Sequence, residues 1–337
     1  MHPPRMNTTT SPSGDAAEKP RIVVLDGYTL NPGDNPWDAV AALGDVTVHD
    51  RTPSDRILDR ARGAHILLTN KTPLTAETLA QLPDLRYVSV LATGYNVVDT
   101  AAARAKGVPV SNVPIYGTDA VAQFVFALLL NHCHGVARHA EAVRQGEWSR
   151  CEDFCFWTQP LVELAGMTMG LVGFGRIGRR VGDLAHAFGM KLLVHDLFQG
   201  DPPSYPVEWT DTGDLFARAD VVSLHCPQTE DNTNLVNRDL LRRMKPSAYL
   251  INTARGGLVN EQDLADALNE GRIAGAACDV VSAEPIRPDN PLLTAKNITL
   301  TPHIAWAALA ARRRLMQTTA ENIAAFLAGA PIHVVNA

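Results

Sequence analysis

The sequence has few cysteines, few aromatic side chains and no strong excess of either charge. Its 337 residues include five cysteines and 6% aromatic residues, and 30 Lys plus Arg against 36 Asp plus Glu give a net charge of -6. No basic run is available to bind a polyanion, so a nucleic acid partner is not expected. An odd set of cysteines in a chain of this length predicts reduced thiols rather than a disulfide framework.

Long hydrophobic runs are also missing. The longest apolar stretch, Val121 to Leu130, is interrupted by Gln123 and falls short of the roughly 20 residues that span a bilayer. The first 20 residues are rich in Thr, Ser and Pro without an apolar export segment, which predicts a disordered tail. We therefore expect a cytoplasmic protein with no membrane segment.

What the sequence does contain is a regular alternation of short apolar runs and amphipathic stretches. Hydrophobic residues make up 46% and charged residues 20%, as in ordinary globular proteins, and the length favours two domains. The runs that predict strands are 21–26, 45–50, 64–70, 86–92 and 108–112, then 168–173, 191–196, 220–226, 248–253, 274–280 and 297–303. This rhythm is typical of an α/β protein with parallel sheets.

The two series of strands are separated by a long apolar helix, predicted over Thr118 to His134, and an irregular segment, EWSRCEDFCFWTQPL. A last helix, predicted over Trp306 to Ala328, is long enough to return to the first domain. We therefore expect one domain from 21–117 with 304–337 and a second from 118–303. Two chain crossings predict a hinge with a cleft.

A glycine-rich loop opens the second series, where a strand runs directly into GFGRIG and a helical pattern. Gly173 permits a tight turn, Gly175 removes the Cβ that would block a pyrophosphate, and Gly178 allows close packing of helix and strand. The next strand ends in Asp196, 18 residues after Gly178, where a carboxylate can accept hydrogen bonds from the adenosine ribose. Together these features predict dinucleotide binding.

Asp196 also bears on which dinucleotide binds. Its negative charge repels a 2′-phosphate, and the residues that follow, 197–200, supply no cation to receive one. The sequence therefore favours NAD (as NADH in the reducing direction) over NADP.

Three further polar residues follow predicted strands, at the sheet edge where open α/β sheets bind their ligands: Arg255 in NTARGG, Glu284 in DVVSAEP and His303 in NITLTPH. Arg255 can grip a carboxylate with two hydrogen bonds. His303 can donate a proton to an oxygen or remove one, and Glu284 beside it favours the imidazolium form and so raises its pKa. This set predicts hydride transfer between NAD(H) and a 2-oxo or 2-hydroxy acid.

The ordered motifs GFGRIG, LHCPQT, NTARGG, DVVSAEP and TPHIAW resemble those of the D-isomer-specific 2-hydroxyacid dehydrogenase family over roughly residues 21 to 337. SVLATGYNVVDTAAA and ENIAAFLAGAPIHVVNA are similar to its glycerate dehydrogenase (hydroxypyruvate reductase) branch. The resemblance implies two doubly wound domains, a flavodoxin-like substrate domain and a Rossmann NAD-binding domain, and a homodimer formed through a region like Ala120 to Leu130. It also implies reduction of a small 2-oxo acid to the D-hydroxy acid.

The resemblance further assigns roles by position. It implies that Arg255, Glu284 and His303 are catalytic. The loop from Ala92 would hold the substrate carboxylate, with substrate contacts from Thr93, Gly94, Tyr95, Arg255 and Trp306. Cofactor contacts would come from Gly173, Gly175, Arg176, Ile177, Gly178, Asp196, Cys226, Pro227, Thr253, Ala254, Asp279 and His303.

Several alternatives stay open or are disfavoured. Trp306 either narrows the pocket toward short polar acids or packs a helix. Some relatives are NAD-sensing corepressors that keep the same Arg, Glu and His, and others act on phosphoglycerate or lactate. Formate dehydrogenases have Gln in place of Glu284. A metal site at His132, Cys133 and His134 is not expected, because neighbours on a helix point about 100° apart.

Overall fold

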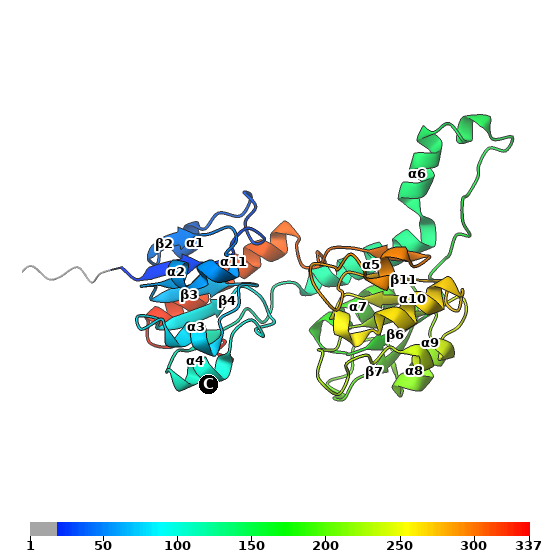
Figure 1. Ribbon diagram of the computed structural model, residues 1–337. Helices are drawn as coiled ribbons and strands as arrows, with labels where there is room; N and C mark the ends of the chain where they lie inside the picture. The colour runs from blue at the N-terminus through cyan, green and yellow to red at the C-terminus, as the bar shows by residue number, and fades with distance from the viewer. Residues whose placement is uncertain (1–18) are drawn as a thin grey trace, which may run out of the picture. The chain divides into compact units, whose positions relative to one another are not determined.

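In the computed structural model, residues 19–337 are described, so most of the tail predicted over 1–20 lies outside the described part. The chain divides into two compact units (Figure 1), Met1–Tyr116 with Arg312–Ala337, and Gly117–Ala311. Both are built on parallel sheets, which confirms the predicted α/β class.

Unit 1 contains a five-stranded sheet in the order β2-β1-β3-β4-β5. Every pairing between these strands is parallel, and the order is that of a flavodoxin-like doubly wound sheet. The central strands are apolar and buried along their whole length, as expected where helices cover both faces. The strands are β1 (Arg21–Val24), β2 (Asp45–Val48), β3 (Ile66–Thr69), β4 (Tyr87–Val90) and β5 (Val110–Ser111).

Short helices and one long helix surround this sheet: α1 (Asp38–Ala41), η1 (Ser54–Arg56), α2 (Ile57–Ala61), α3 (Ala76–Ala80), α4 (Thr100–Ala105) and α11 (Leu309–Leu327). Leu315 and Ile323 of α11 belong to the same buried cluster as Ile22 of β1. The rings of Tyr87 and Phe326 stack with centroids 4.4 Å apart. The end of the chain therefore contributes to the core of unit 1.

Unit 2 contains a seven-stranded parallel sheet in the order β12-β11-β10-β9-β6-β7-β8. Counted from β6, this is the Rossmann order with one added strand. The strands are β6 (Thr168–Val172), β7 (Lys191–His195), β8 (Glu208–Trp209), β9 (Val221–Leu224), β10 (Tyr249–Asn252), β11 (Gly275–Cys278) and β12 (Ile298–Leu300). Two buried clusters flank the sheet, so the central strands are covered on both faces.

The helices of unit 2 are α5 (Thr118–His134), α6 (Val136–Arg144), η2 (Trp148–Arg150), α7 (Arg176–Ala187), α8 (Thr212–Arg218), α9 (Arg238–Arg243), η3 (Gly256–Leu258), α10 (Glu261–Asn269) and η4 (Pro291–Thr294). Residues of α5 and α7 lie in one buried cluster, and residues of α8, α9 and α10 lie in the other. The predicted helix at 118–134 is confirmed, and it ends at Gly135, whose φ of 50° is left-handed.

Helix α6 and the irregular residues 145–162 extend away from the sheet of unit 2 (Figure 1), and we call this segment the arm. Within residues 19–337, no single helix is both long and apolar enough to cross a bilayer. The pair α5 and α6, bent by 50°, passes that length and composition test only when both are counted together.

Two elements differ from the sequence-based expectations. Strand β8 was not predicted, because two residues are too short to show an alternating pattern. The last helix begins at Leu309 rather than Trp306. The indole Nε1 of Trp306 donates to the carbonyl oxygen of His303 at 2.9 Å, which holds these residues in a turn before the helix.

Candidate active site at the carboxyl edge of the unit 2 sheet

The glycine loop joins β6 to α7, and two of its glycines are required sterically. Gly173 has a φ of 96°, and a Cβ there would lie 2.5 Å from the backbone nitrogen of Cys226. A Cβ on Gly178 would lie 2.2 Å from the carbonyl oxygen of Gly173. A Cβ on Gly175 would meet no atom within 4 Å. Two glycines therefore close the turn, and the third leaves open space at the start of α7.

Asp196 follows β7 and is bonded to the same loop. Its Oδ2 accepts a hydrogen bond from the backbone of Phe174 at 2.5 Å, and its Oδ1 accepts one from the backbone of Phe198 at 3.0 Å. The carboxylate predicted to read the ribose is therefore held beside the glycine loop. Arg176 and Ile177 form the first turn of α7, where the N–H groups of a helix lack intrahelical acceptors and suit a phosphate.

The end of β9 carries His225, Cys226 and Pro227. Burial raises the pKa of the Cys226 thiol and lowers the pKa of His225 to about 3. Part of His225 reaches solvent, but its Nε2 is buried with no hydrogen-bond partner among the described residues. Sequence reasoning missed this residue. Its signal was the position directly after a strand, beside Cys226, which the resemblance had assigned to the cofactor.

Buried Asn252, the last residue of β10, shapes the loop that carries Arg255. Its side chain donates to the carbonyl oxygen of Arg255 at 2.9 Å and accepts from the backbone of Ala254 at 3.0 Å. The Arg255 guanidinium donates to the carbonyl oxygen of Ala254 at 2.7 Å. The hydroxyl of Thr253 is buried without a partner among the described residues. Asn252 was also missed, although it stands directly before the predicted loop.

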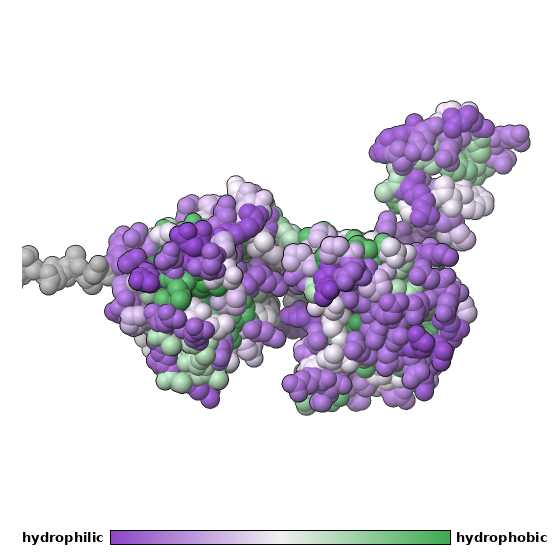
Figure 2. Space-filling model, in the orientation of Figure 1, coloured by the Kyte–Doolittle hydropathy of each residue, from purple (hydrophilic) through white to green (hydrophobic). Residues whose placement is uncertain are grey.

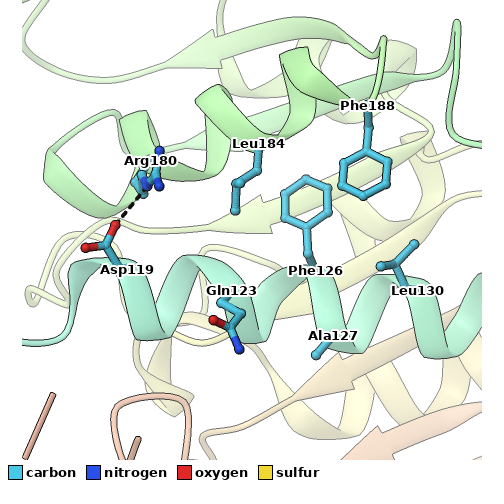
Figure 3. Close-up of a pocket in the computed structure, with 8 residues that line it drawn as sticks. All are labelled: Asp119, Gln123, Phe126, Ala127, Leu130, Arg180, Leu184 and Phe188. Carbon is cyan, nitrogen blue, oxygen red and sulfur yellow. Dashed lines mark hydrogen bonds and ion pairs between the residues drawn. The ribbon is translucent and has the colours of Figure 1, made fainter. Parts of the chain in front are cut away.

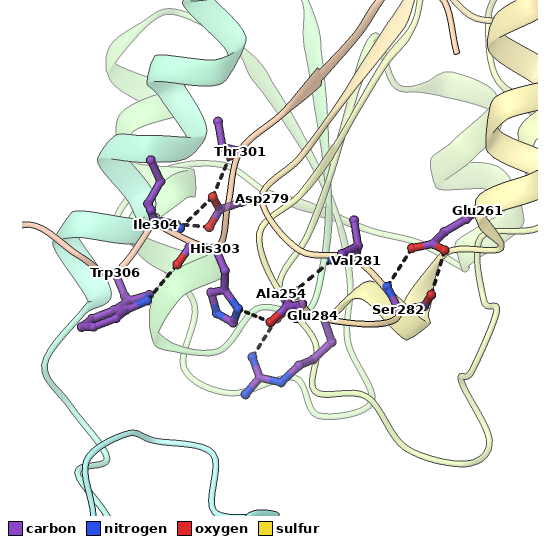
Figure 4. Close-up of polar contacts among 12 residues, drawn as sticks. Ala254, Glu261, Asp279, Val281, Ser282, Glu284, Thr301, His303, Ile304 and Trp306 are labelled. Carbon is purple, nitrogen blue, oxygen red and sulfur yellow. Dashed lines mark hydrogen bonds and ion pairs between the residues drawn. The ribbon is translucent and has the colours of Figure 1, made fainter. Parts of the chain in front are cut away.

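His303 and Glu284 are in direct contact (Figure 4). The Nδ1 of His303 lies 2.6 Å from the Oε2 of Glu284, and both side chains are about 30% exposed. They follow β12 and β11, which are neighbours in the sheet and next to β10. Because parallel strands end at the same edge, Arg255, Glu284 and His303 all belong to one edge of the sheet. A carboxylate on Nδ1 leaves Nε2 as the ring nitrogen that can exchange a proton with a ligand.

Asp279 holds the turn on which His303 sits. This carboxylate is buried, and it accepts hydrogen bonds from the Thr301 hydroxyl at 2.6 Å and from the backbones of Ile304 and Ala305 at 2.9 and 2.8 Å. The backbone N–H of His303 donates to the Asp279 carbonyl oxygen at 2.8 Å. His303 has a φ of 56°, which is costly for a residue with a Cβ. The bonds to Asp279 stabilise that conformation.

A second carboxylate fixes the loop that carries Glu284. Glu261, the first residue of α10, accepts from the backbone and hydroxyl of Ser282, both at 2.7 Å, and from the Asn290 side chain at 2.9 Å (Figure 4). A Cβ on Gly256 would lie 1.9 Å from the carbonyl carbon of Val281, so the loop after β10 packs directly against this one. Sequence reasoning assigned no role to Glu261.

The other predicted substrate residues lie in unit 1, after β4. The Thr93 hydroxyl donates to the Val113 carbonyl oxygen at 2.8 Å, and the Asn112 side chain donates to the Thr93 carbonyl oxygen at 2.7 Å. The backbone of Val98 donates to the Tyr95 carbonyl oxygen at 3.0 Å. The loop that contains Gly94 is therefore anchored on both sides at the carboxyl edge of its own sheet.

The residues set aside as a metal site have other contacts. His132 stacks on Tyr249 with centroids 3.9 Å apart, and burial lowers its pKa. Cys133 is buried, which raises the pKa of its thiol. Over residues 19–337, no group of three or more His, Cys, Asp or Glu side chains could hold a metal ion.

Comparison with known proteins decides the family. Residues 126–305 match the family described as D-isomer specific 2-hydroxyacid dehydrogenase, NAD binding domain. A hydroxypyruvate reductase of Blautia hydrogenotrophica is 47% identical over 322 residues, which is 94% of this chain and 99% of the relative. The chain belongs to the D-isomer specific 2-hydroxyacid dehydrogenases.

Two other similar proteins are also 2-hydroxyacid dehydrogenases or 2-oxo acid reductases by name. A glycerate dehydrogenase of Methylorubrum extorquens is 41% identical over 288 residues, 85% of this chain and 90% of the relative. The crystal structure of an NADPH-dependent glyoxylate/hydroxypyruvate reductase from Sinorhizobium meliloti, in complex with NADP and malonate, has a TM-score of 0.80 at 28% identity. It covers 94% of this chain and 97% of that one. The protein is thus an oxidoreductase of the CH–OH group of 2-hydroxy acids, and its cofactor is NAD(H).

Proposed function

We propose that this dehydrogenase reduces a small 2-oxo acid, of the hydroxypyruvate or glyoxylate type, to the D-hydroxy acid with NADH. The observation that carries the proposal is the contact of 2.6 Å between His303 and Glu284 at the sheet edge that also carries Arg255. The names of the hydroxypyruvate reductase and glycerate dehydrogenase relatives support this substrate class.

The cofactor is assigned to the loop and strand ends of residues 118–303. Open space at Gly175 and the first turn of α7, with Arg176 and Ile177, suit the pyrophosphate. Asp196 suits the ribose hydroxyls. Pro227, after β9, is assigned to the adenine side, and Ala254, after β10, to the nicotinamide half. When bound, the cofactor supplies the hydride.

The proton follows from the bonding of His303. With Nδ1 donating to Glu284, the protonated ring presents Nε2–H, which can protonate the oxygen of the substrate carbonyl. Glu284 fixes the orientation of the ring that carries this proton, through its contact with Nδ1. Arg255 binds the substrate carboxylate through its planar guanidinium and exchanges its present bond to the Ala254 carbonyl oxygen for that contact.

Residues 21–117 and 304–337 are proposed as the substrate domain. The backbone of the loop that contains Thr93, Gly94 and Tyr95 is assigned to the substrate carboxylate, and its anchoring by Val113 and Asn112 supports this role. Trp306 is assigned to the wall of the substrate site. Its indole is tied to the His303 carbonyl oxygen, so the ring keeps a fixed distance from the proton donor and limits the length of the acid.

Loss of NADH absorbance with a panel of 2-oxo acids tests the proposal. We expect hydroxypyruvate and glyoxylate to be reduced with the highest kcat/KM, ahead of pyruvate, 2-oxoisocaproate and phenylpyruvate. A higher kcat/KM for the bulky acids than for hydroxypyruvate and glyoxylate would contradict the assigned role of Trp306 and the proposed substrate class. No reaction with any acid would contradict catalysis itself and favour a protein that only senses NAD(H).

A homodimer is proposed from the surface of unit 2. The arm exposes Phe154 at 89% and Trp157 at 65%, together with Trp148 and Leu161. Figure 2 shows green, hydrophobic residues among the hydrophilic ones on this segment. A groove between α5 and α7 is lined by apolar side chains, including Phe126, Leu130, Leu184 and Phe188, with the Asp119–Arg180 pair at one end (Figure 3). Exposed apolar surface of this kind marks an interface. Light scattering is expected to give twice the mass of the 36.4 kDa chain.

A cytoplasmic location is proposed from the thiols. All five cysteines are free, including exposed Cys155, as expected in a reducing compartment. Fractionation of the source cells checks this, and recovery of the protein outside the cytoplasm would contradict it.

A further inference from the structure

A cation contacts the loop that follows Asp196, the carboxylate predicted to bind the ribose, although the sequence of that loop supplies none. Arg179, in the first turn of α7, donates through Nη1 to the carbonyl oxygen of Asp201 at 2.6 Å. A Cβ on Gly200 would lie 3.0 Å from its Nη2. The guanidinium of Arg179 thus reaches the loop that follows Asp196, although it belongs to a different element. Only the folded chain brings the two together.

Phe174 connects this cation to Asp196. The guanidinium carbon of Arg179 lies 4.8 Å from the centroid of the Phe174 ring. The backbone N–H of the same residue donates to Asp196 at 2.5 Å. Because the Phe174 ring is buried, it is a rigid support, and the planar cation resting on it has a restricted orientation. Phe174 therefore contacts both charged groups: its ring meets the Arg179 cation, and its backbone N–H meets the Asp196 carboxylate.

We propose that Arg179 is a second determinant of cofactor choice, able to receive a 2′-phosphate once the charge of Asp196 is removed. This inference rests on the proposed dinucleotide site. Of the five N–H donors of a guanidinium, the contact with Asp201 uses one. The remaining donors suit a phosphate, which arginine binds with two hydrogen bonds. Asp196 is then the group that keeps the preference for NADH, through repulsion of the 2′-phosphate.

The neighbouring Arg180 provides a matched control. It is also a cation in the first turns of α7, but its side chain is bonded to Asp119 at 2.8 Å and to Asp183 at 3.3 Å (Figure 3). Its replacement removes the same positive charge from the same helix, at a position whose side chain contacts Asp119 of α5. Any general effect of net charge on NADPH binding will therefore appear equally in Arg179 and Arg180 variants.

The test is calorimetric binding of NADH and NADPH to the full chain without any 2-oxo acid. Asp196→Asn should lower the ratio of the NADPH to the NADH dissociation constant by about tenfold or more, the change expected for one charged contact. Arg179→Met in the Asp196→Asn background should reverse most of that gain, and Arg179→Lys should keep part of it. Arg180→Met in the same Asp196→Asn background should change the ratio by no more than about twofold, which is within the usual additivity error.

The ratio of the two dissociation constants distinguishes a change in specificity from damage to the loop, because a distorted loop lowers the affinity for both cofactors alike. Equal ratios for Asp196→Asn with and without Arg179→Met would overturn the inference while leaving the NAD site in place. Equal effects of the Arg179 and Arg180 changes would also overturn it. Failure of the unchanged protein to bind either cofactor would overturn the proposed function together with this inference.

Discussion

The turn around His303 and the arm are both irregular segments of unit 2, but they differ in how their side chains are placed. The polar groups of the turn are hydrogen-bonded inside the unit, whereas aromatic side chains of the arm are exposed to solvent. In the turn, one buried carboxylate, Asp279, accepts three hydrogen bonds, and the indole of Trp306 caps a carbonyl oxygen. In the arm, Phe154 and Trp157 are largely exposed. The polar groups of the turn are bonded within one chain, whereas the arm leaves apolar side chains exposed.

This difference teaches where each property of the enzyme is encoded. The geometry of the proton donor depends on short-range polar bonds inside one unit, so it should respond to single polar substitutions. The proposed dimer depends on apolar area, so it should respond to the loss of aromatic side chains. Four variants test this separation, in order of decreasing effect.

Removal of the proton donor should have the largest effect. His303→Ala is expected to lower kcat by about 10²-fold to 10⁴-fold, the usual contribution of general acid–base catalysis. Calorimetric affinity for NADH should change little, because the imidazole is paired with Glu284. A comparable loss of NADH binding would show that His303 is structural.

Loosening the turn should have the next largest effect. Asp279→Asn replaces one of the two accepting oxygens by an N–H₂ group, so the backbone N–H of either Ile304, bonded to Oδ1, or Ala305, bonded to Oδ2, loses its acceptor. We expect kcat to fall by about 10-fold to 100-fold through misplacement of His303, and the free energy of unfolding to fall by about 1–3 kcal/mol. Stopped-flow kinetics and urea unfolding measure the two.

The control for this variant is Asp289→Asn, which removes an exposed carboxylate paired with Arg287. It should change neither quantity appreciably, because exposed ion pairs contribute little. An Asp279→Asn protein that loses stability at unchanged kcat would show that the turn does not position His303.

The arm should respond in assembly rather than in chemistry. Phe154→Ser with Trp157→Ser is expected to raise the dimer dissociation constant by about tenfold or more, as for central aromatic residues of an interface. Analytical ultracentrifugation measures it. The free energy of unfolding of a dilute monomer should not fall, because these side chains are already exposed. An unchanged dissociation constant would remove the arm from the proposed interface.

The smallest effect concerns His225, whose Nε2 is neither bonded as in the turn nor exposed as in the arm. Burial lowers its pKa to about 3, so between about pH 6.5 and 3 the unfolded chain binds a proton here that the folded chain does not. Stability from this group is present above pH 6.5 and is lost as pH falls. Between pH 7 and pH 5, the free energy of unfolding of His225→Gln should therefore fall by about 2 kcal/mol less than that of the unchanged protein.

Urea unfolding at the two pH values checks the last prediction. Equal losses of unfolding free energy in both proteins would show that His225 is protonated in the folded state.

Much of the fold was predictable because parallel strands that are buried on both faces appear as continuous apolar runs. ILLT and YVSV are such runs. Strand β8 was not, because two residues carry no period. Helix boundaries were predictable where the chain carries its own stop, as at Gly135. The start of α11 was not, because it depends on the hydrogen bond of Trp306 to His303.

The candidate site divides in the same way. Gly173, Gly178, Asp196, Arg255, Glu284 and His303 were identified from the sequence, because each stands in a short motif at the end of a strand. Asn252, Glu261 and His225 were missed for different reasons. The partner of Glu261, Ser282, lies on another loop, and the bonds of Asn252 depend on how the loop after β10 folds. The burial of the His225 Nε2 depends on packing. Asp279 was assigned to the cofactor site from the resemblance. That role stays a prediction. The structure adds that the Asp279 carboxylate accepts three hydrogen bonds from the turn around His303.

The order of elements, the glycine loop and the chemical types at the strand ends could be read from the sequence, because these are encoded within a few neighbouring residues. Which groups meet depends on the folded chain. His303 reached Glu284, Asp279 was enclosed by three donors, and Arg179 came to rest on Phe174 near the loop after Asp196. Such contacts join residues on different elements, and their distances follow from packing rather than from spacing along the chain.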